Sequence, residues 1–366
     1  MKIKLREAMF PDRETLFLDD GELKAYLFRY ESGECGVKLE NSLGYIEVLP
    51  YQGQMVWDAV FYGRSLKMKN DVRFPRFRKE FRDTYGCYVM HCGILTMGCP
   101  SPEDDHPHHG ELPYVTYDEA SIEIDTDERG RYIAVTGLYE YNKAFGDHYA
   151  ARPKTRLREK CALIDIVLEI ENLSLKPMNL MYQCHINNEA KPGSKIWQTL
   201  PWDEKHMVPR VSIPQYNEVD PAFLDLIERV KTDVGATRVI GETDVYDPEL
   251  VLFLRDPIKD ENGCVHYLYQ HEDGSADYTT YNANILNRGV RWMVFHKEWQ
   301  SMGMALPGTA EPEGFLAEKA KGNVRTLPGR ETFVSEITAG ALTKDQAEEK
   351  KKLICSLTGE ADYVHV

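Results

Sequence analysis

Residues 162–187, ALIDIVLEIENLSLKPMNLMYQCHIN, carry the clearest fold signal in the chain. Over 162–172 apolar and polar side chains alternate, which is the pattern of a β-strand with one buried face. The following segment, 173–177, contains Ser, Lys and Pro and is typical of a turn. A second strand is expected over 178–185. We therefore predict two long successive strands, the second ending at a histidine.

Further segments with strand-like patterns occur along the whole chain. They lie at 37–40, 44–49, 121–125, 132–137, 249–254, 289–295 and 332–337. Helical patterns are confined to 221–230 and 344–353, and both look peripheral. Many short strands with Gly and Pro turns, and no alternation of strands with helices, predict an all-β protein, a large antiparallel β-sandwich.

The chain shows no internal repeat and no Pro-, Gly- or Ser-rich linker, so a single domain over 1–366 is expected. Two parts stand apart from the strand pattern. Residues 197–244 are interpreted as an insertion or a crossover between sheets. Residues 343–366 are expected to form a peripheral C-terminal segment.

Composition limits the classes of partner. The 366 residues carry a formal net charge of −15, and nucleic acids and membrane surfaces are bound by basic surfaces. No apolar stretch reaches the length of about 20 residues that a membrane helix needs, and no apolar segment follows the basic N-terminus. The eight cysteines are scattered and form no CxxC pair, which favours reduced thiols and a cytoplasmic protein. The spacing of Cys87, Cys92 and Cys99 does not match common zinc patterns.

A histidine-rich loop is the first candidate for chemistry. Residues 105–113, DHPHHGELP, place His106, His108 and His109 between acids, prolines and a glycine. Imidazole can exchange a proton near neutral pH, so this loop suits acid/base work. A solvated surface loop is the plain alternative. A metal site is a third reading, because His106 and His108 with Glu111 resemble the HxH…E pattern of cupins.

Two further segments suit acid/base chemistry. His185 ends a strand, where a sheet would hold it rigidly at a cleft, although a half-buried structural histidine is the simpler reading. Glu311 precedes a proline in a Gly-rich turn and could act as a base. The basic run 73–82, RFPRFRKEFR, could bind an anionic group through arginine, or be an ordinary exposed segment.

In their order along the chain, these segments resemble the aldose 1-epimerase family of the galactose-mutarotase-like superfamily, and most closely a little-characterised branch of aldose-epimerase-like proteins. The resemblance spans roughly residues 25 to 340. Its motifs are CGILTMGC at 92–99, HGELP at 109–113, the two-strand segment 171–187 ending in HIN, Trp299, the Glu-Pro at 311–312 and LPG at 327–329. It implies a mutarotase-like fold and a carbohydrate substrate.

The resemblance also implies roles for individual residues. Glu311 would be the general base and His185 the general acid, while His109 would bind the sugar. Further substrate-binding positions are expected at Arg78, Arg82, Asn187 and Trp299.

The sequence departs from the family pattern in several places. Glu111 stands where an Arg or an aromatic residue is more usual, and Glu313 rivals Glu311. The family's arginine could also be Arg64 or Arg76. Its aspartate has no clear motif here, and Asp203 and Asp277 are the candidates.

The implied reaction interconverts the anomers of a free sugar. Glu311 would take the proton of the anomeric hydroxyl and protonated His185 would donate to the ring oxygen, so that the ring opens and recloses on its other face. No metal or organic cofactor is required. The partner would be a small carbohydrate, with an anionic sugar as one option, and the protein a monomer or homodimer. The alternatives are a non-catalytic carbohydrate-binding protein and a metal-dependent, cupin-like sugar isomerase using His106, His108 and Glu111.

Overall fold

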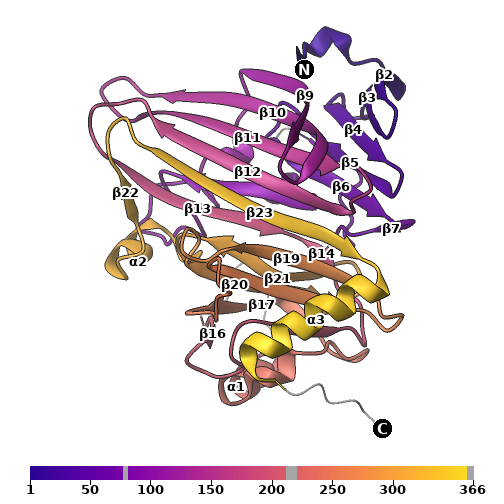
Figure 1. The fold of residues 1–366 in the computed structure, drawn as a ribbon. Coiled ribbons are helices and arrows are strands. Elements are labelled where there is room, and N and C mark those ends of the chain that lie inside the picture. Colours follow the sequence, from indigo (N-terminus) through magenta and orange to yellow (C-terminus); the bar gives the residue numbers. More distant parts are fainter. Residues whose placement is uncertain (77–80, 212–220, 361–366) are drawn as a thin grey trace.

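The computed structural model describes residues 1–76, 81–211 and 221–360, which form two large antiparallel sheets packed face to face (Figure 1). The nine-stranded sheet has, in spatial order, β1 (Lys2–Lys4), β9 (Glu119–Asp127), β10 (Gly130–Asn142), β11 (His148–Arg158), β12 (Leu163–Asn172), β23 (Thr332–Leu342), β19 (Ala276–Asn282), β18 (Cys264–Gln270) and β15 (Lys195–Gln198). The predicted antiparallel β-sandwich is confirmed.

The second sheet has fourteen strands and carries the residues of interest. Its main path is β16 (Met207–Pro209), β17 (Tyr246–Leu254), β20 (Arg288–Phe295), β21 (Gln300–Gly308), β13 (Met178–Ile186), β8 (Val89–Ile94), β6 (Val56–Phe61), β5 (Gly44–Val48), β4 (Cys35–Asn41), β3 (Leu23–Arg29) and β2 (Thr15–Asp20). Short strands join it beside this path: β14 (Asn188–Glu189), β22 (Arg325–Leu327) and β7 (Arg64–Ser65).

The segment 162–187, which carries the clearest fold signal in the sequence, links the two sheets. β12 pairs with β11 and β23 in the nine-stranded sheet, whereas β13 pairs with β8 in the fourteen-stranded sheet. Side chains alternate along β13 as the two-residue period requires. Leu180, Tyr182 and Cys184 join the large core that both sheets share, and Met181 joins a second cluster made by the fourteen-stranded sheet and its loops. His185 has the same parity as Met181, so it points to the face turned away from the sandwich core.

In the described ranges, three α-helices lie at the periphery of the sheets (Figure 1): α1 (Pro221–Thr232), α2 (Phe315–Ala320) and α3 (Lys344–Thr358). Short 3-10 turns occupy η1 (Glu7–Met9), η2 (Phe81–Asp83), η3 (Leu112–Tyr114) and η4 (Val234–Thr237). α3 begins at a capping box in which the Thr343 side chain accepts from the Gln346 backbone N–H. In the described part of the chain, no helix has both the length and the apolar character needed to cross a bilayer.

The segment 197–244 runs between edges of the two sheets. β15 is the edge strand of the nine-stranded sheet, and β16, which follows it in sequence, is an edge strand of the fourteen-stranded sheet. α1 follows β16 and buries Phe223, Ile227 and Val230, which share one helical face. The segment therefore connects the two layers.

Candidate functional site

His185 is held rigidly on the outer face of the fourteen-stranded sheet. It lies on β13 opposite Met90 of β8 and is 4% exposed. Its Nδ1 lies 2.6 Å from the Asn187 side-chain oxygen. The Asn187 amide nitrogen donates to the Cys87 carbonyl over 3.0 Å, which turns the amide oxygen toward the imidazole. The imidazole is therefore fixed in orientation by an amide that is itself fixed.

Aromatic rings surround His185. The Tyr85 hydroxyl lies 3.1 Å from His185 Nε2, 3.4 Å from His185 Nδ1 and 3.4 Å from the Asn187 side-chain oxygen. The rings of Tyr85 and His185 meet edge to face. The Trp292 ring centroid is 5.3 Å from that of His185. Trp299, predicted to bind substrate, stacks on Tyr85 at a centroid distance of 6.2 Å. Such flat apolar faces suit the C–H faces of a sugar ring.

His109 faces His185 from the histidine-rich loop. The two imidazole centroids are 5.6 Å apart and their planes are nearly perpendicular. Backbone hydrogen bonds of 2.8 Å tie His109 N–H to the Gly98 carbonyl and the His109 carbonyl to Gly93 N–H. The next residue, Gly110, has φ +75°, and a Cβ there would lie 2.2 Å from the Thr96 carbonyl oxygen. The local chain thus needs glycine at 110 to bring His109 against the sheet.

Burial controls the charge of both histidines. It lowers the pKa of His185 to about 4, against a small opposing effect of the hydrogen bond with Asn187. Burial also holds the pKa of His109 well below its ordinary value, and the neighbouring His185 and His108 act in the same direction. Both imidazoles are therefore neutral at pH 7.

Glu311 is buried in an ionic network. Arg255 donates to both of its oxygens, from Nε over 2.5 Å and from Nη2 over 2.9 Å, and Lys321 Nζ donates to Oε2 over 2.7 Å. Burial by itself raises the pKa of Glu311, but the bonds from Arg255 and Lys321 outweigh it and hold the pKa below its ordinary value. Lys321 also binds Glu313 and Glu318. Glu311 is thus ionised, with both oxygens engaged by cations.

Backbone contacts connect Glu311 to the histidine pair. The Pro312 carbonyl accepts from Cys99 N–H over 3.0 Å, and Gly98 forms an isolated β-bridge with Glu313. Since Gly98 also accepts from His109, the segment 98–99 lies between the histidine loop and the Glu311 turn. The backbone next to Glu311 therefore contacts the same segment, 98–99, that binds the backbone of His109.

Several residues of this region were not predicted from the sequence. Tyr85 contacts His185 directly. Arg210 is paired with Glu249, whose other oxygen accepts from Trp292 Nε1 over 2.6 Å. Arg255 and Lys321, which bind Glu311, were not predicted either. None of them lies in a recognisable motif, because each depends on the pairing of strands or turns far apart in sequence.

Of the predicted arginines and aspartates, Arg64, Asp277 and Asp203 form ion pairs of their own. Arg78 falls outside the described residues, and Arg82 is exposed in η2. Arg64 donates to Asp277 over 2.6 Å beside a cavity of about 210 Å³ that is also lined by Ser194 and His271. Asp277 lies on β19 of the nine-stranded sheet. Asp203 pairs with His206 in an exposed turn.

The contacts of Glu111 and His106 do not support a cupin-like metal site made by His106, His108 and Glu111. Glu111 accepts from Leu95 N–H over 3.0 Å and from the Tyr149 hydroxyl over 2.6 Å. His106 Nε2 accepts from Phe315 N–H over 3.2 Å. Over residues 1–76, 81–211 and 221–360, the one group of possible metal-ligand atoms within reach of each other is Glu311, Glu313 and Glu318, and the Lys321 ammonium already binds all three.

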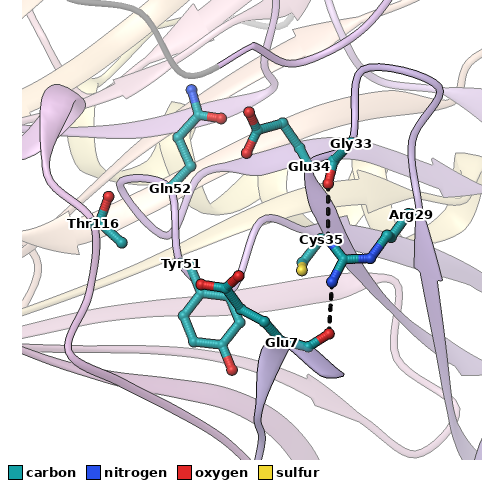
Figure 2. A pocket seen from close by; sticks show the side chains of 8 residues that line it. All are labelled: Glu7, Arg29, Gly33, Glu34, Cys35, Tyr51, Gln52 and Thr116. Atoms are coloured by element: carbon teal, nitrogen blue, oxygen red, sulfur yellow. Dashed lines mark hydrogen bonds between the residues drawn. The ribbon is translucent and has the colours of Figure 1, made fainter. Parts of the chain in front are cut away.

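Another cavity, of about 150 Å³, lies between the N-terminal strands (Figure 2). Figure 2 shows the Arg29 guanidinium between the carbonyls of Glu7 and Gly33, to which it donates over 2.6 and 2.9 Å. Burial raises the pKa of the adjacent Cys35 thiol to about 11, so this thiol is protonated at neutral pH. The guanidinium is thus bound to backbone carbonyls and the thiol is protonated, so neither is a base at neutral pH.

Comparison with solved structures identifies the fold class. A "putative aldose 1-epimerase" from Klebsiella pneumoniae superposes with a TM-score of 0.82 at 13% identity, covering 98% of this chain and 96% of that one. A galactose mutarotase-like protein from Clostridium acetobutylicum gives 0.57 at 14% identity over 88% and 99%. Another from Lactobacillus casei gives 0.54 at 13% identity over 84% and 100%. No family model and no curated protein sequence matches the chain. The chain therefore has the galactose-mutarotase-like fold.

Proposed function

We propose that the protein is an aldose 1-epimerase-like isomerase, which interconverts the anomers of a free sugar by acid/base ring opening. The observation that carries the proposal is the pair of neutral, facing imidazoles of His109 and His185 among aromatic rings on the outer face of the sheet. His185 is proposed as the acid that gives a proton to the ring oxygen, so its imidazole, which is neutral in the free protein, has to take up a proton when the sugar binds. His109, Asn187 and Trp299 orient the sugar or the groups that contact it. Because the two imidazoles are 8% and 4% exposed, a sugar must displace the side chains that cover them.

Among the residues that the structure describes, the charges around the site favour an uncharged sugar over an anionic one. Arg210 is paired with Glu249, and Arg255 with Glu311. Lys321 is bound by three carboxylates. An anionic group would have to compete with these carboxylates for its cation, and an uncharged sugar has no such cost.

Glu311 is proposed as the base that takes the anomeric proton. Its lowered pKa keeps it ionised near neutral pH, as a base must be. Its hydrogen bonds with Arg255 and Lys321 also lower its proton affinity, so the sugar hydroxyl has to replace one of these bonds. Glu313, which shares Lys321, is the natural control because it is more exposed.

Polarimetry or NMR on freshly dissolved α-glucose, α-galactose and a panel of phosphorylated and acidic sugars tests the proposal. We expect the wild-type protein to accelerate the approach to anomeric equilibrium for at least one uncharged sugar. Glu311→Gln should lose about 10² or more of this acceleration, whereas Glu313→Gln should retain most of it. An unchanged rate in Glu311→Gln would refute the assignment of the base.

A carbohydrate-binding protein without catalysis is the second candidate, because the aromatic side chains around His185 would suit it equally. Such a protein would bind a sugar in calorimetry and leave anomer exchange at its spontaneous rate. The same panel therefore separates the two functions.

A further inference from the structure

Arg291 is a fully buried arginine that forms no ion pair in the part of the chain that the structure describes. It lies on β20 and is 0% exposed. Its Nε donates to the Met304 carbonyl over 3.1 Å, and its Nη2 donates to the side-chain oxygen of Gln198, the last residue of β15. Both acceptors are neutral. The guanidinium therefore bridges the two sheets through hydrogen bonds, but it has no counter-charge.

The surroundings of Arg291 do not remove its charge. Burial lowers the pKa of the guanidinium only to about 10, so the group is still protonated at pH 7. Tyr267 is its titratable neighbour on the nine-stranded sheet, and burial raises the pKa of the phenol, which is therefore uncharged. A buried charge without a partner is strongly unfavourable. One positive charge between the sheets is thus left to be compensated.

Unpartnered N–H groups surround the neighbouring indole of Trp202. Among the described residues, the buried atoms Arg291 Nη1, Trp202 Nε1 and Arg238 Nη2 have no hydrogen-bond partner. The guanidinium carbons of Arg291 and Arg238 each lie 5.3 Å from the centre of the Trp202 ring. All three unpartnered nitrogens can donate and none can accept. Because buried polar groups are almost always satisfied, such a set points to a bound acceptor.

The charge balance separates an anion from a water molecule as this acceptor. A water oxygen accepts hydrogen bonds but leaves the charge of Arg291 uncompensated, whereas an anion does both. Arg238 already has a counter-charge, because its Nη1 is paired with Glu360. The region therefore lacks a single negative charge, which favours a monovalent anion. The complete burial of Arg291 favours a small one.

We propose that a small monovalent inorganic anion of the chloride type binds beside Arg291 Nη1, with Trp202 Nε1 and Arg238 Nη2 as further donors. The ion would connect the two layers of the fold. Arg291 belongs to the fourteen-stranded sheet, its partner Gln198 belongs to the nine-stranded sheet, and Trp202 and Arg238 lie in the segment 197–244 between them. The site is separate from the histidine pair and does not depend on the proposed sugar chemistry.

Thermal melting in chloride gives the first test. An anion that binds the folded chain alone raises the stability with the logarithm of its concentration. We expect Tm to rise by about 2 °C for each tenfold increase in sodium chloride above its Kd, at an ionic strength kept constant with sodium gluconate. Gluconate is the reference anion because it is too large for an enclosed site. Equal Tm values for the wild-type protein in the two salts would overturn the proposal.

Two arginine variants localise the effect of chloride. Arg291→Met removes the charge and keeps an unbranched side chain, so its Tm should be the same in chloride and in gluconate. Arg158→Met is the matched control, because Arg158 is also buried, at 5% exposed, but is bound by Asp127 and Asp165. It should be less stable than the wild-type protein and keep the full dependence on chloride. A chloride dependence that survives in Arg291→Met would overturn the proposal.

Crystals of the wild-type protein grown with sodium bromide give a readout that does not require any variant to fold. Bromide replaces chloride and scatters anomalously. We expect an anomalous peak within hydrogen-bonding distance of Arg291 Nη1. Bromide peaks on the surface with none beside Arg291, or a water molecule at that position, would overturn the proposal.

Discussion

Buried neutral histidines should make the protein sensitive to mild acid. Burial lowers the pKa of His91 and His185 to about 4 and that of His109 well below its ordinary value. In the unfolded chain each would titrate near its ordinary value of 6.5. Between these values the unfolded state binds protons that the folded state cannot bind, so the free energy of unfolding falls as the pH falls.

The size of the effect follows from the pKa difference. From pH 7 to pH 5, one histidine with a pKa of 6.5 unfolded and about 4 folded loses about 2 kcal/mol of stability. His91 and His185 together amount to about 4 kcal/mol, a large part of the 5–15 kcal/mol typical of a folded protein, and His109 acts in the same direction. Ordinary carboxylates stay mostly ionised in both states over this range, so they contribute little.

His91 allows the effect of a buried histidine on stability to be measured without changing the candidate site. It lies on β8 with its Nδ1 2.9 Å from the Tyr182 hydroxyl, and Tyr182 belongs to the core between the sheets. Urea unfolding at pH 7 and pH 5 should show that His91→Gln loses about 2 kcal/mol less than the wild-type protein between the two values. Equal losses in the two proteins would refute the argument that His91 is held neutral by burial.

Three further perturbations test separate parts of the structure. Gly110→Ala should destabilise by about 2 kcal/mol or more, because its Cβ would collide with a backbone carbonyl; Gly322→Ala, with the same φ of +75° and open space, is the control in thermal melts. Lys321→Met leaves buried Glu311 without its ammonium and should cost about 3 kcal/mol at pH 7, less at pH 5, in urea unfolding. Thr343→Ala removes the cap of α3 and should cost about 1 kcal/mol, also in urea unfolding.

The sheet architecture was predictable because the two-residue period of buried strands is a local signal. The strands at 162–172 and 178–185 correspond to β12 and β13, and the helices at 221–230 and 344–353 correspond to α1 and α3. β21 was missed because its sequence QSMGMALPG is buried along nearly its whole length and so does not alternate. Which sheet each strand joins was not predictable, since β12 and β13 are adjacent in sequence and lie in different layers.

The candidate site was predictable only where a motif marks it. His109 and His185 stand in recognisable segments, and the structure places their rings against each other. Tyr85 stands in no motif, and it contacts His185 from a hundred residues away in the sequence. The cations that hold Glu311 come from the end of β17 and from the residue after α2. Contacts of this kind are set by tertiary packing, which a single sequence does not encode locally.

The position of the site explains how one fold can tolerate wide sequence variation. Along β13, the side chains of Leu180, Tyr182 and Cys184 stabilise the sandwich, while His185 lies on the opposite face. A substitution on the outer face therefore leaves the shared core intact, and a substitution in the core need only remain apolar and similar in volume. Because the core and the outer face can vary separately, the fold can be kept with a TM-score of 0.82 at only 13% identity. It also means that the chemistry must be argued from the outer face itself, where the Asn187 amide oxygen and the Tyr85 hydroxyl both lie within hydrogen-bonding distance of the His185 imidazole, a contact that the fold alone does not require.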